Sequence, residues 1–225
     1  NWFSQDPIGC KEIRDELDQH AQNQRDFKLP SRVIAKIFVF RLIYGGTCWS
    51  YVFDPDFNWI SKSHKYWQGI IDAFYDKYRG IGEQHRKWMD ETIRTGQLVM
   101  PTGRIYPFEA RPNRYGDMAW PRTQIINYPV QGIGHDLTTI ARVSLFKRVK
   151  SHESLARSVH FICTVHDSVV LDIKQSDLAD LVPLVRGVFT DIPRNFNRLF
   201  NVPFNLPVRG ELKIGKNLLE MEEIK

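Results

Sequence analysis

The segment from Ser31 to Gly46 constrains this chain more than any other, because it predicts one helix that ends at a pair of glycines. Along it, two basic and then two aromatic residues recur at intervals of four: Arg32, Lys36, Phe40 and Tyr44. An α-helix turns once in about 3.6 residues, so side chains four apart form a slowly drifting stripe on one face. Cations suit phosphate oxygens, and flat rings suit a sugar and a base. The stripe therefore suggests a site for a phosphorylated ligand that carries a base.

The same segment also fits a helix with no binding role. Six apolar residues lie between the members of the stripe: Ile34, Ile37, Phe38, Val39, Leu42 and Ile43. They would give a helix here a buried face and would leave the charged residues merely solvated. Spacing alone does not choose between these two interpretations.

The pattern Arg-x3-Lys-x3-Phe-x3-Tyr-Gly resembles motif B of the family A DNA polymerases, the DNA polymerase I group. All four positions match, and Gly45 follows them in place. The resemblance implies that Arg32 and Lys36 hold the triphosphate of the incoming deoxynucleotide. It also implies that Phe40 packs on the sugar and base and that Tyr44 guards the templating position.

Composition is compatible with this resemblance and does not require it. The chain has 31 basic and 26 acidic residues, and its net charge of +5 fits a polyanionic partner as well as many proteins without one. Three scattered cysteines form neither a CxxC pair nor a metal-binding spacing, which favours a reducing compartment. No apolar run approaches the length of a membrane span, about 18 residues. These features predict a cytoplasmic protein, and the resemblance implies that the cell is a bacterium or a phage-infected host.

The rest of the sequence predicts a mixture of helices and hairpins without repeats. Helices are expected over 11–24, over 62–95 with a break near Gly80 to Gly82, over about 30 residues ending near Val149, and over 175–199. Hairpins are expected over 97–108 and 159–173, and a last strand over 207–215. The segments 49–60 and 109–122 are expected to be loops. The predicted fold class is α+β.

The expected hairpin at 159–173 carries a carboxylate at its turn. An aspartate in such a turn is ordinarily a turn former and nothing more. The segment TVHDSVVLD, however, resembles motif C of the same family, usually written Val-His-Asp-Glu, and it follows motif B in the expected order. The resemblance implies that Asp167 ligates Mg²⁺ and that His166 lies near the primer terminus. Ser168 replaces the usual Glu, and a hydroxyl is a far poorer ligand for a divalent metal.

A third match is TQIINYPVQGIGHDL, residues 123–137, which resembles the Asn-x-Pro-x-Gln-Gly segment of the family. Asn127 and Gln131 lie four apart on one expected helical face, and the resemblance implies contacts with minor-groove acceptors of the primer–template. Helix capping is the alternative role for these amides. The family's usual Arg before this Asn is Thr123 here, so Arg122 is the candidate in its place.

Two smaller matches fit the same arrangement. Thr102-Gly103-Arg104 resembles the hairpin after the fingers helices, which implies that Arg104 lies near duplex phosphate; a solvated turn charge is the alternative. Asp18-Gln19-His20 resembles the Asp-x-His before motif B, which implies that His20 lies near the phosphates of the nucleotide. An incidental histidine on a polar helix is the alternative.

The family's motif A, Asp-Tyr-Ser-x-Ile-Glu, does not occur in the chain. In the family its Asp supplies the other metal-binding carboxylate, and two Mg²⁺ ions need ligands that bridge them. We therefore expect the chain alone to be inactive. A second polypeptide is expected to supply motif A, the thumb and a 3′–5′ exonuclease.

The resemblance as a whole implies the C-terminal part of a DNA polymerase that adds dNTPs to the primer 3′-OH of a primer–template by two-metal transfer. Residues 1–97 would form helical fingers, with the motif helix at 31–45, and residues 98–225 part of a palm with an antiparallel sheet. A single-subunit RNA polymerase is one alternative, disfavoured by Phe40 and the His-Asp turn. A noncatalytic DNA-binding or scaffolding remnant is the other, disfavoured because Arg32, Lys36 and Asp167 are all retained.

Overall fold

The computed structural model describes residues 1–224 and divides into two compact units, Asn1–Gly132 and Ile133–Lys225. The described part of the chain combines helices with four two-stranded antiparallel sheets. The α+β class predicted from the sequence is confirmed. The predicted boundary between fingers and palm at 97/98 is a functional division that the compact units do not test.

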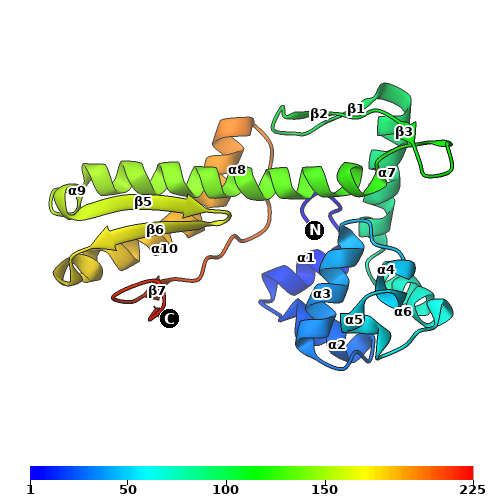
Figure 1. Ribbon diagram of the computed structural model, residues 1–225. Coiled ribbons are helices and arrows are strands. Elements are labelled where there is room, and N and C mark those ends of the chain that lie inside the picture. Colours follow the sequence, from blue (N-terminus) through cyan, green and yellow to red (C-terminus); the bar gives the residue numbers. More distant parts are fainter. Residues whose placement is uncertain (225) are drawn as a thin grey trace. The chain divides into compact units, whose positions relative to one another are not determined.

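The first unit is mainly helical. Its helices are α1 Pro7–Arg14, α2 Gln19–Asp26, α3 Arg32–Ile43, α4 Trp49–Val52, α5 Pro55–Asn58, α6 His64–Lys77 and α7 Arg79–Thr95. The helices α3 to α6 gather around an aromatic core, and α7 leads from them to a hairpin (Figure 1). Phe38, Tyr51 and Trp67 are fully buried in this core, and the Tyr51 hydroxyl donates a hydrogen bond to the Phe38 carbonyl at 3.0 Å. One face of α3 packs against this core.

The segment 11–24, expected to be one helix, is divided between α1 and α2. The prediction is therefore wrong for the residues between Arg14 and Gln19. The chain leaves α1 at Asp15, and Glu16 adopts a positive φ of 58°. Asp18 then caps α2, since its Oδ1 accepts hydrogen bonds from the amides of His20 and Ala21. A short aspartate side chain competes for backbone amides and so starts a new helix more readily than it continues one.

The break expected near Gly80 to Gly82 lies at Tyr78 instead, and both glycines belong to α7. Gly80 serves close approach: a Cβ there would lie 3.1 Å from Asp6 Cα. The Asp6 carboxylate accepts from the Gly9 amide at the start of α1 and from the Gly80 amide at the start of α7, both at 2.9 Å. One buried carboxylate therefore satisfies the amino-terminal amides of two helices.

Two small hairpins complete the first unit. Strands β1 Gln97–Val99 and β2 Ile105–Pro107 pair as predicted, with Leu98 opposite Tyr106. The segment 109–122, expected to be a loop, also contains a short pair, β3 Arg111–Pro112 and β4 Met118–Ala119. The 49–60 segment likewise holds the short helices α4 and α5, where only a loop was expected.

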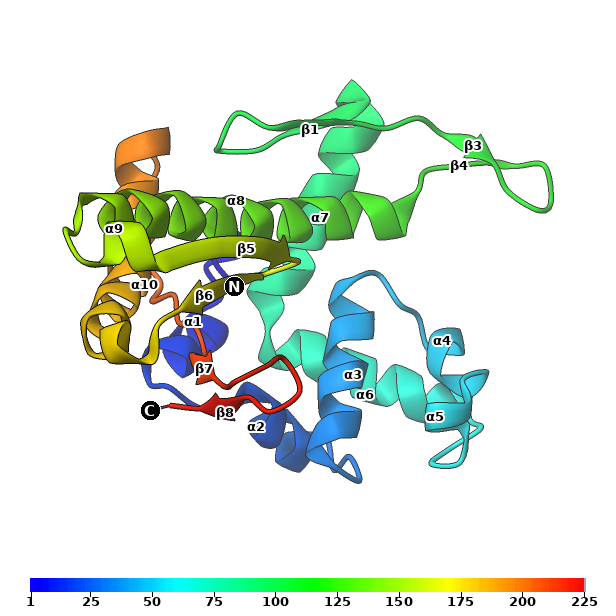
Figure 2. The ribbon, with the colours of Figure 1, turned by 60° about the vertical axis from the view of Figure 1, so that its left-hand side comes forward.

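The helix α8, Arg122–Ser151, is 30 residues long, as predicted, and it leads into the second unit. That unit continues with α9 Leu155–Ser158, β5 Val159–Val165, β6 Ser168–Ile173, the 3₁₀ turn η1 Gln175–Asp177 and α10 Leu178–Phe200. The β5–β6 hairpin lies alongside α8, with α10 behind both (Figure 2). Phe146 on α8 meets Phe161 on β5, with ring centroids 5.4 Å apart, and Arg148 on α8 pairs with Asp191 on α10.

The last strand is shorter than the expected 207–215. Only β7 Lys213–Ile214 is extended in a sheet, and it pairs with β8 Glu222–Glu223, which the sequence had not suggested. The three cysteines are free thiols, with Cys10 and Cys48 buried and Cys163 exposed. No helix within residues 1–224 is both long and apolar enough to cross a membrane.

Candidate nucleotide and DNA site

The helix α3 has both a buried face and the charged, aromatic stripe, so the two interpretations of its sequence hold on opposite faces. Ser31 starts the helix, because its hydroxyl accepts from the Ile34 amide at 3.2 Å. Ala35, Phe38 and Leu42 are buried in the core. Members of the stripe lie on the accessible side: Arg32 and Lys36 are exposed, Phe40 is 38% exposed and Tyr44 is partly buried. The stripe is therefore available to a ligand.

Arg32 at the amino-terminal end of the stripe is held by Asp18. Its Nε lies 2.6 Å from Asp18 Oδ2, the oxygen that does not cap α2. The hydrogen bond from the guanidinium holds the pKa of Asp18 below its usual range. Asp18 and Arg32 lie on separate elements, so no sequence pattern indicates their ion pair.

His20 lies beside the stripe on α3. Its ring is 5.6 Å from that of Phe40. Burial, and then the charge of Arg32, lowers the pKa of His20, which favours the neutral ring. Its Nδ1 is buried, and no hydrogen-bond partner for it is found within residues 1–224. A neutral imidazole with an unsatisfied nitrogen next to a cation is suited to a polar ligand.

The carboxyl-terminal end of the stripe is built from stacked rings. The rings of Phe40 and Tyr44 are 6.1 Å apart and nearly parallel, at 27°, and Lys36 Nζ lies 5.9 Å from the Phe40 ring. Gln131 donates from Nε2 to the Tyr44 hydroxyl at 2.9 Å. The motif B and Asn-x-Pro-x-Gln matches, far apart in sequence, therefore meet in one place.

The other predicted DNA-contacting residues of this unit lie around α8. Asn127 Oδ1 is buried, and the described residues offer it no hydrogen-bond partner. Arg104 and Tyr106 of the β1–β2 hairpin approach Gly132 so closely that a Cβ there would collide with the Tyr106 hydroxyl. Arg122 lies near Tyr75 and His85. Burial raises the pKa of Tyr75, and the charge of Arg122 opposes that rise. At His85, burial and then the charge of Arg122 lower the pKa to about 4.

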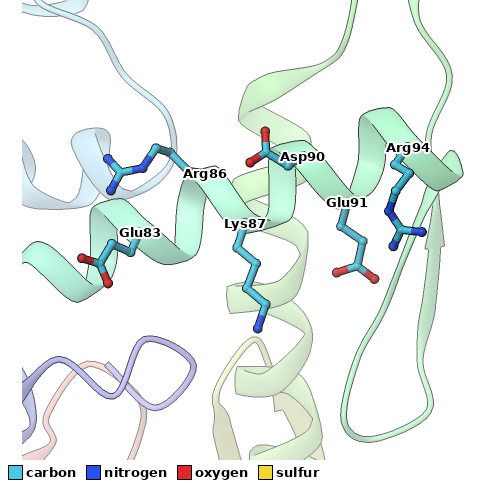
Figure 3. A pocket seen from close by; sticks show the side chains of 6 residues that line it. All are labelled: Glu83, Arg86, Lys87, Asp90, Glu91 and Arg94. Atoms are coloured by element: carbon cyan, nitrogen blue, oxygen red, sulfur yellow. The ribbon is translucent and has the colours of Figure 1, made fainter.

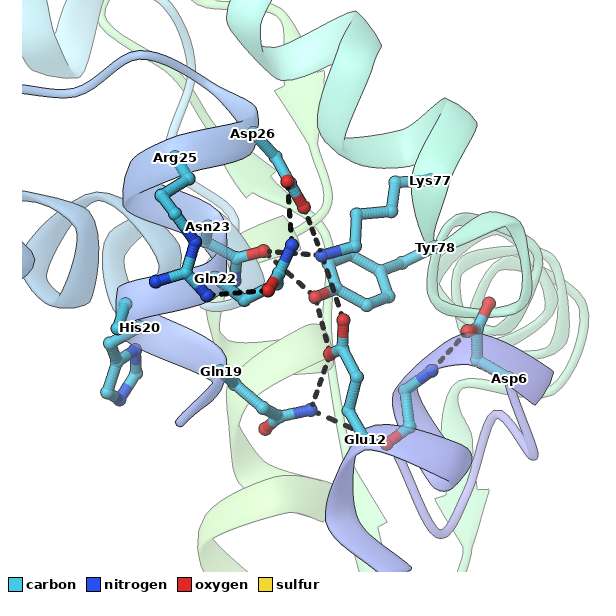
Figure 4. A network of polar contacts seen from close by, with 12 residues as sticks. Asp6, Glu12, Gln19, His20, Gln22, Asn23, Arg25, Asp26, Lys77 and Tyr78 are labelled. Atoms are coloured by element: carbon cyan, nitrogen blue, oxygen red, sulfur yellow. Dashed lines mark hydrogen bonds and ion pairs between the residues drawn. The ribbon is translucent and has the colours of Figure 1, made fainter. Parts of the chain in front are cut away.

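A polar network fixes α2, and with it His20 and Asp18, to the helical core (Figure 4). Lys77 Nζ lies 2.9 Å from Glu12 Oε1, 2.8 Å from Asp26 Oδ2 and 3.0 Å from Asn23 Oδ1. The Tyr78 hydroxyl lies 2.7 Å from Glu12 Oε2, and burial raises the pKa of Tyr78 to about 12. Burial opposes the charge on Lys77, but hydrogen bonds with Asp26, Tyr78 and Glu12 raise its pKa overall. These partners lie far apart in sequence, so no local pattern could have identified the network.

Asp167 and His166 belong to the second unit and form the two-residue turn of the β5–β6 hairpin. Val165 pairs with Ser168, and His166 takes a positive φ of 51°. The Ser168 hydroxyl donates to the Val165 carbonyl at 2.8 Å, so it closes the turn. The turn residues His166 and Asp167 are exposed.

A metal site in the chain requires several ligand side chains close to one another. Across the described range 1–224, no three His, Cys, Asp or Glu side chains are close enough to hold a metal ion. Asp167 is one exposed carboxylate, and the hydroxyl beside it is engaged in the turn. The chain's own residues do not fit a pair of magnesium ions without further ligands.

A shallow pocket on α7 contains none of the predicted site residues. Its lining combines charges of both signs: Glu83, Arg86, Lys87, Asp90, Glu91 and Arg94 (Figure 3). All six side chains project from one helix, and three acids offset three bases. Such a face is typical of a solvated helix and does not favour an anionic ligand.

The chain belongs to DNA polymerase family A, whose family model matches residues 3–220. The thermostable DNA polymerase I of Thermus filiformis is 25% identical over 160 residues, which cover 68% of this chain and 17% of that protein. The DNA polymerase of Bacillus phage SP01 is 29% identical over 94 residues, 42% of this chain and 10% of that protein. The chain thus spans less than a fifth of these relatives.

A solved structure supports the fold. The POL domain of Pol1 from M. smegmatis, in complex with DNA primer-template and dNTP, superimposes with a TM-score of 0.74 at 18% sequence identity. The match covers 92% of this chain and 35% of that one. The described residues therefore form part of a polymerase I-like fold.

Proposed function

We propose that the chain supplies the nucleotide-binding fingers and part of the palm of a template-directed DNA polymerase. The observation that carries the proposal is the meeting of His20, Arg32 and Phe40 with the Tyr44–Gln131 pair on one accessible surface. Family membership and the polymerase fold support it. The substrates would be a DNA primer–template and a dNTP, in the cytoplasm of the cell.

The two ends of the stripe bind different parts of the nucleotide. Arg32 and Lys36 neutralise the triphosphate, because charge-assisted hydrogen bonds to phosphate oxygens are among the stronger polar contacts. The unsatisfied Nδ1 of His20 donates to or accepts from the same ligand, according to its tautomer. The rings of Phe40 and Tyr44 stack with the sugar and base, and Gln131 fixes the Tyr44 hydroxyl. Positioning of this kind accounts for much of the catalysis of phosphoryl transfer.

Asp167 would contribute one metal ligand at the primer terminus, with His166 beside it. Asn127, Gln131, Arg104 and Arg122 would contact the duplex. The other carboxylates for two Mg²⁺ ions would come from outside the 225 residues, with motif A, thumb and exonuclease carried by a second polypeptide. Magnesium would screen the phosphate charges and lower the pKa of the attacking hydroxyl when bound.

Primer extension by the chain combined with a polypeptide that carries a motif A aspartate tests the proposal. Asp167→Ala should abolish extension, and Asp172→Ala, which removes an exposed carboxylate on the following strand β6, should leave it unchanged. Equal activity of the Asp167→Ala variant and the unaltered chain would contradict the proposed role. Absence of extension under all conditions, with DNA binding intact, would favour a noncatalytic DNA-binding remnant.

A further inference from the structure

The helix α8 belongs to both compact units. The first unit ends at Gly132 and the second begins at Ile133, inside the helix Arg122–Ser151 (Figure 1). Ile125 near its start is fully buried in the first unit, and Val149 near its end is fully buried in the second. Each end of α8 is therefore anchored in a different unit.

The middle of α8 has little packing of this kind. All residues from Val130 to Thr139 are exposed or partly exposed, whereas Pro129 before them and Ile140 after them are buried. A segment with few buried contacts opens locally at a lower cost in free energy than the core of a helix. The middle of α8 therefore depends mainly on its own backbone hydrogen bonds.

Those backbone hydrogen bonds are weakened where the two units meet. Pro129, Gly132 and Gly134 are the proline and the glycines of α8, and the rest of its sequence has neither residue type. Proline has no amide hydrogen, so the Ile125 carbonyl lacks its helical partner. Glycine is the least favourable residue in a helix after proline. The weakest part of the helix therefore coincides with the boundary between the units.

The two glycines differ in what they accommodate. A Cβ at Gly132 would collide with the Tyr106 hydroxyl, so close packing requires glycine there. A Cβ at Gly134 would meet nothing within 4 Å, so packing does not explain the second glycine. The Thr138 hydroxyl donates to the Gly134 carbonyl at 3.1 Å, and a contact of this kind, from one turn later, often bends a helix. Gly134 therefore favours flexibility over the stability that alanine would give.

We propose that the segment 129–138 of α8 is a hinge at which the second unit moves relative to the first. A hinge needs only a few residues that absorb changes in φ and ψ, and glycine has the widest choice of both angles. The α3 stripe lies in the first unit and the Asp167 turn in the second, so bending here would change their separation while each unit keeps its own structure. The proposal concerns the chain without any ligand and does not depend on the proposed function.

Distance measurements between two spin labels on the 225-residue chain test the hinge. Lys87→Cys on α7 and Ala179→Cys on α10 place one label at an exposed position of each unit, and Cys163→Ser removes the exposed native thiol. The chain with these labels should give a broad distribution of distances. Gly134→Ala should narrow that distribution, because alanine strengthens the helix at the hinge. Gly69→Ala is the matched control and should leave the width unchanged, since Gly69 is exposed within α6 and a Cβ there also meets nothing within 4 Å.

Hydrogen exchange followed by mass spectrometry measures the size of the effect. The amides of 130–138 should exchange faster than those of 142–150 in the same helix. Gly134→Ala should slow exchange over 130–138 by about fivefold, which corresponds to the roughly 1 kcal/mol between alanine and glycine in a helix. Gly69→Ala should leave exchange over 130–138 unchanged.

A single narrow distance distribution for the chain with an unaltered α8 would overturn the hinge, because the two units would then form one rigid body. Equal widths for Gly134→Ala and Gly69→Ala would also overturn it, since the movement would then lie outside α8. Failure of primer extension, together with a distribution that narrows in Gly134→Ala, would remove the proposed function and leave the hinge in place. The two proposals are therefore separable.

Discussion

At the residue scale, the two carboxylate oxygens of Asp18 have different hydrogen-bond partners. One oxygen caps α2 and the other holds Arg32. An incoming triphosphate would compete with this carboxylate for the same guanidinium. Asp18 therefore sets how freely Arg32 meets phosphate.

Asp18→Asn should tighten dNTP binding by up to about fivefold, because an exposed ion pair contributes about 0–1 kcal/mol and the amide oxygen still caps α2. Equilibrium binding of a fluorescent dNTP measures the effect. Asp15→Asn is the control, since Asp15 pairs with Lys11 outside the site. Weaker binding by Asp18→Asn would mean that the carboxylate orients Arg32 for phosphate instead of competing with it.

His85 should make the stability of the chain depend on pH. The side chain is 5% exposed, and burial, followed by the charge of Arg122, lowers its pKa from 6.5 to about 4. As pH falls from 6.5 to 4, the unfolded chain takes up the proton and the folded chain does not, so the free energy of unfolding decreases. The loss should approach about 3 kcal/mol and stop below pH 4, where both states are protonated.

Urea unfolding of the unaltered chain and of His85→Gln across this pH range measures that loss. Carboxylates also titrate near the lower end of this pH range. The quantity compared is therefore the slope of the free energy of unfolding against pH in the two proteins. His85→Gln should flatten the slope between pH 6.5 and 4. Parallel slopes for the two proteins would show that folding does not lower the pKa of His85.

At the scale of elements, the Lys77 network ties α1, α2 and α6 together. Lys77→Met keeps the aliphatic stem but leaves the buried Glu12 carboxylate without its cation. We expect the free energy of unfolding to fall by about 3 kcal/mol. Lys65→Met on the exposed part of α6 should change it by less than about 0.5 kcal/mol.

Urea unfolding monitored by circular dichroism measures both variants. A loss that is equal in Lys77→Met and Lys65→Met would contradict the network's role. Because α2 carries His20 and Asp18, Lys77→Met should also weaken dNTP binding at temperatures where the chain stays folded.

The elements that the sequence predicted are those with strong local signals. Ser31 and the glycines bound α3, apolar periodicity marks α8, and two β-prone runs around a polar turn mark the β5–β6 hairpin. The errors depend on contacts that sequence position does not reveal. Gly80 lies inside α7, where its amide donates to the Asp6 carboxylate, and β7 pairs with β8, a strand later in the chain.

The candidate site divides in the same way. The stripe on α3 follows from helical spacing, so its residues were predictable. The Asp18–Arg32 ion pair, the His20–Phe40 contact and the Gln131–Tyr44 hydrogen bond join separate elements. No periodicity relates such residues, and only the family resemblance had suggested that His20 and Gln131 belong to the site.

At the scale of the whole molecule, the chemistry is distributed over two compact units. The stripe and Gln131 belong to the first, and the Asp167 turn belongs to the second. A net charge of +5 is compatible with association with DNA, and an association of that kind would weaken as the salt concentration rises. The residues proposed to bind the nucleotide all lie in the first unit, so nucleotide binding is the simplest property to measure.

Equilibrium titration of a dNTP onto the 225-residue chain tests the central claim, that the α3 stripe binds the triphosphate. Lys36→Ala should weaken binding by about 10-fold or more, because it removes a charge-assisted contact with phosphate. Lys87→Ala removes an exposed lysine of α7 outside the stripe and should leave binding unchanged. If Lys36→Ala binds the dNTP as tightly as the unaltered chain, the stripe is only the solvated face of a buried helix.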